Sequence, residues 1–264
     1  MTRHLITALS LALATTAAAQ QAPDFRWEKA LGAGKEVSLH NIAGDVTVKP
    51  STSGKVEVLG FKRGRGDLAR IHAEVRETSR GVVVCVVNDD DDWTCDESGL
   101  STHSRRDRYR DRDSWDRATM NLEVAIPANT DIRANSVSGD VSVEGAQGDV
   151  RAGSVSGDIR ISRIRSASVY GNSVSGNVLA QIDALTGRGD LSFKTVSGDV
   201  TLDLPKALDA DLSMSTVSGR MDSDYPLTLN GRMNRRSIEA RIGNGGRHLD
   251  IGTVSGDVRL RTNR

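Results

Sequence analysis

The chain has 264 residues, and its 35 Lys and Arg side chains are balanced by 35 Asp and Glu, so the formal net charge is zero. A balanced charge gives no reason to expect a nucleic-acid partner, which would require a basic surface. Hydrophobic residues make up 37% of the chain but aromatic residues only 3%. This composition excludes a thick core of large side chains and favours a thin, stacked core of Val, Ile, Leu and Ala.

The first 19 residues have the pattern of a signal peptide. A short basic start, Met1 to His4, precedes an apolar run at 5–14 and the small residues 17–19. The run is too short for a permanent membrane helix, and no later stretch is long and apolar enough to be a transmembrane segment of the mature chain. We therefore expect cleavage near Ala19 and a periplasmic or secreted protein in which residues 20–34 form an N-terminal extension.

Short alternating segments follow this extension and predict β-strands. Residues 40–45, His-Asn-Ile-Ala-Gly-Asp, are a diverged relative of a repeat that recurs later in the chain, and they predict a turn at Gly44. No helical periodicity is present after the signal segment, so the mature chain is predicted to be all-β. The predicted strands span 37–39, 46–48, 56–61, 71–78, 82–87 and 120–126.

Cys85 and Cys95 are the only two Cys residues. In an exported chain an even number of cysteines indicates a disulfide, here one that closes a local loop. The nine residues between them, 86–94, do not match a zinc spacing, and no His pair lies nearby. We expect a disulfide, no metal site and no cofactor.

Residues 88–118 form a charged insertion. Positions 89–97 carry six acids, and positions 105–117 carry six Arg and four Asp. Two interpretations stay open: a solvated insertion without fixed structure, and an exposed loop that binds a polyanion, a glycan or a protein. Exposed aromatic rings beside Arg suit stacking on sugars and pairing with anionic groups. The candidate binding residues are Trp93, Arg105, Arg106, Arg108, Tyr109, Arg110, Arg112 and Trp115.

The last half of the chain repeats Ser-Val-Ser-Gly-Asp or a close variant. The copies begin at 136, 154, 173, 195, 216 and 253, so the steps between them are 18, 19, 22, 21 and 37. A short repeat cannot bury its own apolar face, whereas stacked copies can. The spacing predicts a single-domain parallel β-solenoid, similar to a β-helix, with about 20 residues per rung. This domain would span residues 35–264, and the 37-residue step would hold two rungs, one with a degraded motif.

The Ser-Gly-Asp part of each repeat is predicted to form the corner of a rung, because Gly tolerates positive φ and Asp can accept hydrogen bonds from nearby backbone N–H groups. Stacking predicts a column of Ser and Thr hydroxyls that hydrogen bond to one another, and a column of Asp interrupted by Asn177 and by Arg220 after Asp199. A calcium ladder on the Asp column is the alternative. The predicted structural turn residues are Gly44, Gly139, Asp140, Gly157, Asp158, Gly176, Asn177, Gly198, Asp199, Gly219, Gly256 and Asp257.

Several motifs in this order resemble the bacterial putative-adhesin family of domains of unknown function. They are residues 41–46, 82–87 and 122–127, the Val-Ser-Gly-Asp series, and the closing segment 243–258. The resemblance covers residues 35–262 and implies an extracytoplasmic β-solenoid with an adhesion or envelope-associated role. It implies no defined ligand or catalytic residue, and the charged insertion departs from the family pattern.

The sequence favours a protein that is not an enzyme. It has no Ser-His-Asp order, zinc motif or phosphate loop, and the four His residues after the signal segment are scattered. We expect an exported envelope protein, an adhesin-like binding or structural module whose partner is an envelope or surface polymer or protein. Two alternatives stay open: an envelope-stress sensor that reports to a membrane partner, and a carbohydrate-active β-helix enzyme.

Overall fold

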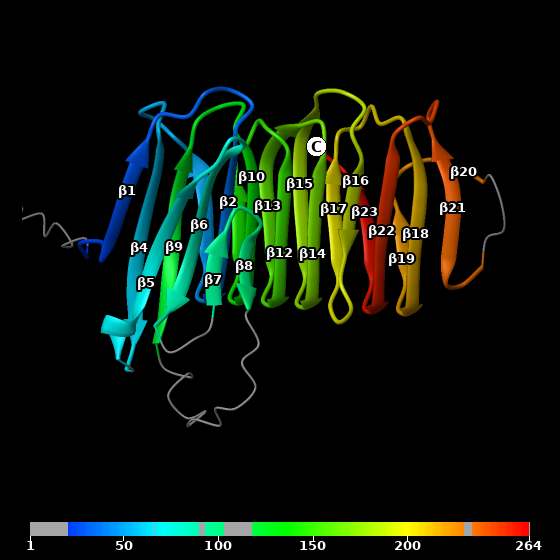
Figure 1. Ribbon diagram of the computed structural model, residues 1–264. Coiled ribbons are helices and arrows are strands. Elements are labelled where there is room, and N and C mark those ends of the chain that lie inside the picture. Colours follow the sequence, from blue (N-terminus) through cyan, green and yellow to red (C-terminus); the bar gives the residue numbers. More distant parts are fainter. Residues whose placement is uncertain (1–20, 66, 90–92, 103–117, 230–233, 264) are drawn as a thin grey trace, which may run out of the picture.

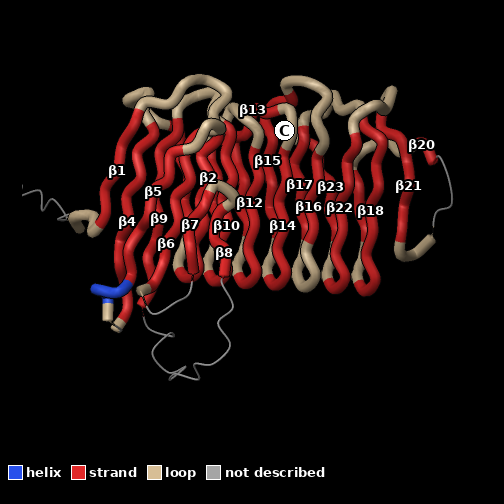
Figure 2. The backbone as a smooth tube through the Cα atoms, viewed as in Figure 1, coloured by secondary structure: helices blue, strands red, loops and turns tan. Residues whose placement is uncertain are grey.

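The computed structural model describes residues 21–65, 67–89, 93–102, 118–229 and 234–263. Within these ranges the chain forms a ten-stranded sheet, an eleven-stranded sheet and a separate two-stranded hairpin (Figures 1 and 2). The described helix is a single 3-10 turn, Leu68–Arg70, so none of the described helical structure could cross a membrane. The all-β prediction is confirmed.

Each copy of the repeat builds one rung, with one strand in each large sheet. β10 (Asp131–Ser138) ends at a corner, and β11 (Val141–Glu144) continues in the opposite sheet. Neighbouring rungs pair in parallel and in register, so Ser136 pairs with Ser154, and Ser154 pairs with Ser173. The predicted parallel β-solenoid is therefore confirmed. The next three rungs are β12 (Val150–Ser156) with β13 (Ile159–Ser166), β14 (Val169–Ser175) with β15 (Val178–Leu185), and β16 (Leu191–Lys194) with β17 (Val200–Leu204).

The final repeat does not follow its predecessor in the stack. The rung of β22 (His248–Ser255) and β23 (Val258–Thr262) lies between the β16–β17 rung and the rung of β18 (Ala210–Ser218) and β19 (Met221–Ser223). The prediction of two successive rungs in the 37-residue step was wrong. The chain leaves β19, forms β20 (Thr228–Leu229) and β21 (Ser237–Ile242) at the end of the eleven-stranded sheet, and then returns into the stack.

The chain is also interleaved at the opposite end of the molecule. β2 (Glu36–Ala43) and β3 (Val46–Pro50) form the rung beside β10 and β11, and β6 (Gly81–Asn88) and β9 (Ala118–Ile126) form the rung beyond it. Residues 89–117 thus connect the two strands of a rung, at the place where the other rungs have a short corner.

Antiparallel strands extend both ends of the stack. β1 (Phe25–Lys29) and β4 (Val56–Gly64) continue the ten-stranded sheet beyond β9, and β5 (Ile71–Glu77) continues the eleven-stranded sheet beyond β6. β1 lies within the segment predicted as an N-terminal extension. A salt bridge between Lys29 and Glu77 joins the edge strands of the two sheets. Such capping matters because an open solenoid end would offer unpaired backbone groups to another chain.

Aliphatic side chains fill the space between the two large sheets. In β10 the side chains of Ile132 and Ala134 are buried, whereas Arg133 and Asn135 on the outer face are partly exposed. Phe193 is the largest fully buried side chain. The core is thin and made mainly of Val, Leu and Ile, as the composition predicts.

At the six Val-Ser-Gly corners a Ser or Thr hydroxyl donates a hydrogen bond to a Gly carbonyl of the neighbouring rung. Ser154 Oγ donates to the carbonyl of Gly139 at 3.0 Å, and equivalent bonds recur along the stack. The predicted column of hydroxyls bonded to one another is therefore corrected, since their partners are backbone carbonyls. The corners approach so closely that a Cβ on Gly198 would collide with the carbonyl oxygen of Gly176, and the φ of Gly198 is +146°. Both constraints require glycine there.

The residue after each corner Gly links one rung to the next. Oδ1 of Asp140 accepts a hydrogen bond from the N–H of Asp158 at 2.8 Å, and Oδ1 of Asp158 accepts one from the N–H of Asn177 at 2.7 Å. The ladder continues through Asp199, Asp257 and Arg220 in that spatial order. Asp is therefore an acceptor between rungs, and it does not simply cap its own turn.

The order of this ladder corrects the predicted charge pattern. Asp257, and not Arg220, is the neighbour of Asp199, because the last rung is inserted into the stack. Arg259 relieves the repulsion by pairing with Asp199 at 2.8 Å and with Asp257 at 2.7 Å. The N–H of Asp257, followed by the Arg259 guanidinium, lowers the pKa of Asp199.

Candidate binding groove

Only part of the predicted binding loop lies within the described residues. Trp93 is the first residue of the described hairpin. The predicted signal peptide, residues 1–19, lies outside the described residues. The other candidate loop residues also lie outside them: Arg105, Arg106, Arg108, Tyr109, Arg110, Arg112 and Trp115.

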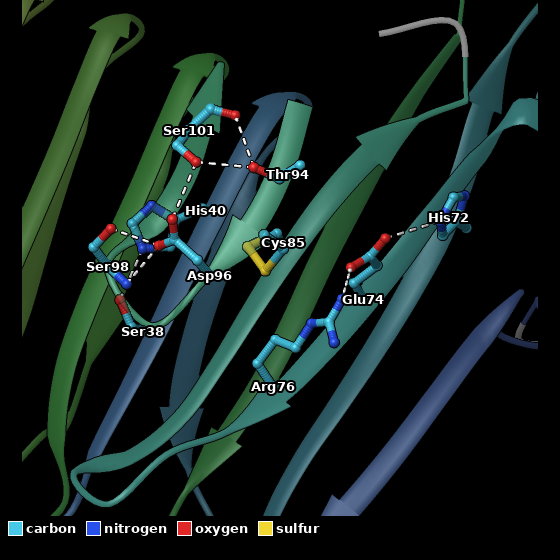
Figure 3. The surroundings of a disulfide bond; sticks show 11 residues. Ser38, His40, His72, Glu74, Arg76, Cys85, Thr94, Asp96, Ser98 and Ser101 are labelled. Carbon is cyan, nitrogen blue, oxygen red and sulfur yellow. Dashed lines mark hydrogen bonds and ion pairs between the residues drawn. A yellow bond between two sulfur atoms is a disulfide. The ribbon is translucent and has the colours of Figure 1, made fainter. Parts of the chain in front are cut away.

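The hairpin of β7 (Trp93–Asp96) and β8 (Gly99–Thr102) lies on the outer face of the eleven-stranded sheet, over β6 and β2. A disulfide joins Cys95 of β7 to Cys85 of β6, with their Cα atoms 5.9 Å apart (Figure 3). Trp93 and Leu100 pack against the apolar cluster that surrounds this disulfide. β6 is thus covered on both faces, which explains its uninterrupted apolar run at 82–87. The disulfide predicted from the cysteine count is present.

Hydrogen bonds within the hairpin fix its turn above His40 (Figure 3). The Asp96 carboxylate accepts bonds from the Ser98 hydroxyl at 2.5 Å, the Ser98 N–H at 2.8 Å and the Ser101 hydroxyl at 3.1 Å. These donors, the Ser98 hydroxyl first, lower the pKa of Asp96. Gly99 lies so close to the His40 imidazole that a side chain at position 99 would collide with the ring.

His40 is neutral in this position at neutral pH. Burial beneath the hairpin is the main cause that lowers its pKa. The positive charge of Arg133 also lowers this pKa, whereas the negative charges of Glu36 and Asp96 raise it. Its Nε2 lies 2.9 Å from the Ser38 hydroxyl. The imidazole therefore supports the hairpin as a packed, uncharged ring.

An open groove of about 370 Å³ begins where the hairpin ends. Trp93 and Leu100 form one wall, and outward-facing residues of β2, β10, β12 and β14 form the floor. Asn41 lines the groove although it is only 2% exposed. Its Nδ2 donates to the carbonyls of Gly44 and Met120, whereas its buried Oδ1 has no hydrogen-bond partner in the described part of the chain.

A row of exposed valines leads from this groove along the stack. Each is the Val of a Ser-Val-Ser-Gly or Thr-Val-Ser-Gly motif, and it points outward because the Ser or Thr before it points into the corner. These side chains are between 45% and 57% exposed, which is unusual for valine. The valine ribbon, in spatial order, consists of Val137, Val155, Val174, Val196, Val254 and Val217.

The valine ribbon was missed from the sequence because the whole motif was interpreted as turn chemistry. The alternation of the preceding residues carries the signal: Ala134 and Ser136 face inward, so Val137 must face outward. Val137 and Val155 line the groove as well as belonging to the ribbon.

The groove offers binding chemistry. Trp93 provides an aromatic ring, Val137 and Val155 provide methyl groups, and Asn135 and Asn172 provide amides. In the described ranges no group of three or more His, Cys, Asp or Glu side chains is arranged to hold a metal ion. These features suit the retention of an amphipathic ligand.

The fold and the groove together define a two-sheet parallel β-solenoid with an open groove on the outer face of one sheet. This chain belongs to the Toastrack DUF4097 family, a domain of unknown function, whose model matches residues 36–261. No curated protein matches the chain.

The solved structures similar to it include two described as adhesion proteins. One is a "putative cell adhesion protein" from Clostridium sporogenes, with a TM-score of 0.48 and 10% identity over 90% of this chain and 99% of the other. The second is a "putative adhesin" from Bacteroides fragilis, with a TM-score of 0.32 and 12% identity over 90% of this chain and 96% of the other.

Proposed function

We propose that this protein is a non-enzymatic, adhesin-like surface module that binds an extended polymer on the outer face of the eleven-stranded sheet. The observation that carries the proposal is the continuity of the Trp93 groove with the valine ribbon. Contiguous apolar surface bordered by polar groups is typical of interaction sites and uncommon elsewhere on soluble proteins.

The shape of this surface favours a polymer over a small molecule. Small-molecule sites are concave and enclose most of their ligand. Here the valine ribbon extends over six rungs, and neighbouring strands are about 4.8 Å apart, so its length is on the order of 24 Å. A linear ligand could contact the ribbon repeatedly while one of its units occupies the groove beside Trp93.

We also propose that the protein acts outside the cytoplasm, in the periplasm or after secretion, and that residues 1–19 direct its export. The disulfide between Cys85 and Cys95 supports this location, because such bonds persist in oxidising compartments. Residues 35–264 would then act as one binding domain, consistent with the single apolar core that runs through the rungs.

The test is retention of the chain from Gln20 onward on a panel of immobilised envelope and cell-surface polysaccharides. Trp93→Ala removes the aromatic wall and Val155→Asp places a charge on the ribbon, so each is expected to weaken binding about tenfold or more. Leu179→Asp is the matched control, because Leu179 is 38% exposed but lies on the ten-stranded sheet. Unchanged binding by both groove variants would refute the proposal.

The same incubations distinguish a binding protein from an enzyme. A binding module retains the polymer intact, whereas a hydrolase or a lyase would release new reducing or unsaturated ends. Retention without new ends supports the proposal. Cleavage of the polymer by the wild-type protein, but not by a heat-inactivated sample, would show that the protein is an enzyme.

A further inference from the structure

Arg151 is a cation beside the groove that has no carboxylate partner among the described residues. It lies on β12, on the same outer face as Gly153 and Val155. Its guanidinium lies 5.1 Å from the centre of the Tyr170 ring on the neighbouring strand β14. This stacking orients the side chain, which is partly exposed, and leaves its N–H donors available to a ligand.

The charges around Arg151 are already engaged. The Asp149 carboxylate, two residues before Arg151 in the chain, accepts a hydrogen bond from the N–H of Ser168 at 3.2 Å. Two other cations on this face have carboxylate partners: Arg133 on the neighbouring strand β10 pairs with Glu36, and Lys194 on β16, two rungs away, pairs with Asp250. Among the described residues no carboxylate forms an ion pair with Arg151, so its guanidinium would complement an anionic group on a ligand.

A strip of amides connects Arg151 to the groove. Between Arg151 and Val155 the outward position on β12 is Gly153, which has no side chain. The Asn135 Oδ1 lies 2.7 Å from the position that a Cβ on residue 153 would take, so this amide reaches across the gap. At about 3.3 Å per residue, Arg151 and Val155 are roughly 13 Å apart along the strand, the length of a short oligosaccharide.

This arrangement suits a sugar chain better than a peptide. Sugar rings present C–H groups on their faces and hydroxyls at their edges, which match the Trp93 ring, the valine methyls and the amides of Asn135 and Asn172. A peptide strand gains most of its affinity from backbone hydrogen bonds at a sheet edge. The groove lies over the face of the sheet, where β10, β12 and β14 already pair with one another.

We infer that the ligand of the groove is a linear acidic glycan, and that Arg151 binds the carboxylate of one of its sugar units. The inference rests on the proposed function, that the groove holds a polymer, and it adds the chemical class of that polymer.

The experiment compares polygalacturonate, alginate and hyaluronate, each beside its carboxyl-reduced counterpart, with the wild-type protein and two variants. Wild type is expected to bind at least one acidic polymer about tenfold tighter than its reduced counterpart, and added salt should weaken only the acidic interaction. Arg151→Gln should lower affinity for the acidic polymer about tenfold and leave the reduced polymer unaffected. Arg160→Gln is the control, because Arg160 is exposed on β13 of the same rung but on the opposite sheet.

Failure of this inference can be separated from failure of the proposed function. If neutral polymers bind as tightly as acidic ones, or if Arg151→Gln changes nothing, the acidic class is wrong, while loss of binding by Trp93→Ala would still support the groove. If polyglutamate binds as tightly as the polysaccharides in an Arg151-dependent way, the ligand is an acidic peptide and the glycan assignment is wrong. If wild type retains no polymer at all, both the inference and the proposed function fail.

Discussion

Asp158 uses one carboxylate oxygen to hold the next rung in place. Its Oδ1 accepts the N–H of Asn177 at 2.7 Å and the Nδ2 of the same residue at 3.3 Å. Asn177 then plays the same part with its amide oxygen, which accepts the N–H of Asp199 at 2.9 Å. The ladder thus needs an oxygen acceptor at this position and does not need a negative charge.

This distinction predicts different effects for two substitutions. Asp158→Ala leaves the N–H of Asn177 without this acceptor and should lower the free energy of unfolding by about 1 kcal/mol. Asp158→Asn keeps an amide oxygen in place and should remain close to wild type. Urea unfolding of both variants is the measurement. Equal losses in the two variants would mean that the charge, and not the hydrogen bond, is what stabilises the corner.

At the scale of elements, the hairpin depends on a single covalent bond to the solenoid. The disulfide joins Cys95 of β7 to Cys85 of β6, two positions that are 10 residues apart in the sequence. The hairpin contributes only Trp93, Cys95 and Leu100 to the small apolar cluster outside the main core. A two-stranded hairpin with so few buried side chains gains too little from packing to offset the conformational entropy that docking costs it, so the disulfide is needed to hold it on the sheet.

We therefore expect the double substitution Cys85→Ser with Cys95→Ser to remove about 2 to 3 kcal/mol from the free energy of unfolding, as loss of a short disulfide loop does. Polymer binding in the groove should be lost as well, because the wall that carries Trp93 would leave the sheet. Trp93→Ala in the disulfide-bonded protein is the matched comparison, since it should lose binding at a smaller cost in stability. A double variant that binds as wild type does would show that the hairpin docks without the disulfide.

The sequence predicted most of the strands, but it did not predict the full order in which the rungs stack. Rung spacing and period-two alternation are local properties, so the strands around each corner could be identified. The position of the last rung in the stack could not, because Thr216 and Thr253 begin near-identical motifs that can pair equally well with the rung before them. Stacking the rungs in chain order would place the last rung beyond β18 and β19, whereas it lies between them and the β16–β17 rung.

At the scale of the whole molecule, the groove combines parts that no single motif contains. Trp93 was predicted from the sequence as an exposed aromatic residue of the charged insertion, but the floor of the groove beside it comes from rungs that begin more than 30 residues away in the sequence. Arg151 lies in an ordinary strand, and its significance depends on Tyr170 of the next rung and on the absence of a carboxylate partner in the described part of the chain. These are properties of the stack, so they become visible only when the rungs are placed side by side.

The stability of the folded protein is also expected to depend on pH. Four carboxylates with lowered pKa values determine how it is lost in acid. The pKa values of Asp96, Asp199, Asp211 and Asp257 are all lowered from the ordinary 3.8, mainly by the hydrogen bonds that these carboxylates accept. A lowered pKa in the folded state means that the unfolded chain takes up protons first. The stability from these groups is fully present above pH 3.8 and is lost as the pH falls below that value toward the folded pKa values.

His40 adds an earlier step to this profile. Burial under the hairpin lowers its pKa below the ordinary 6.5, so the unfolded chain binds a proton at a pH where the folded protein does not. The melting temperature should therefore begin to fall below pH 6.5, well before the carboxylates titrate. His40→Gln should remove this first decline and retain the second, which thermal unfolding followed between pH 8 and pH 2.5 at constant ionic strength would detect. A wild-type profile that is flat from pH 7 to pH 5 would contradict the burial of a neutral imidazole beneath the hairpin.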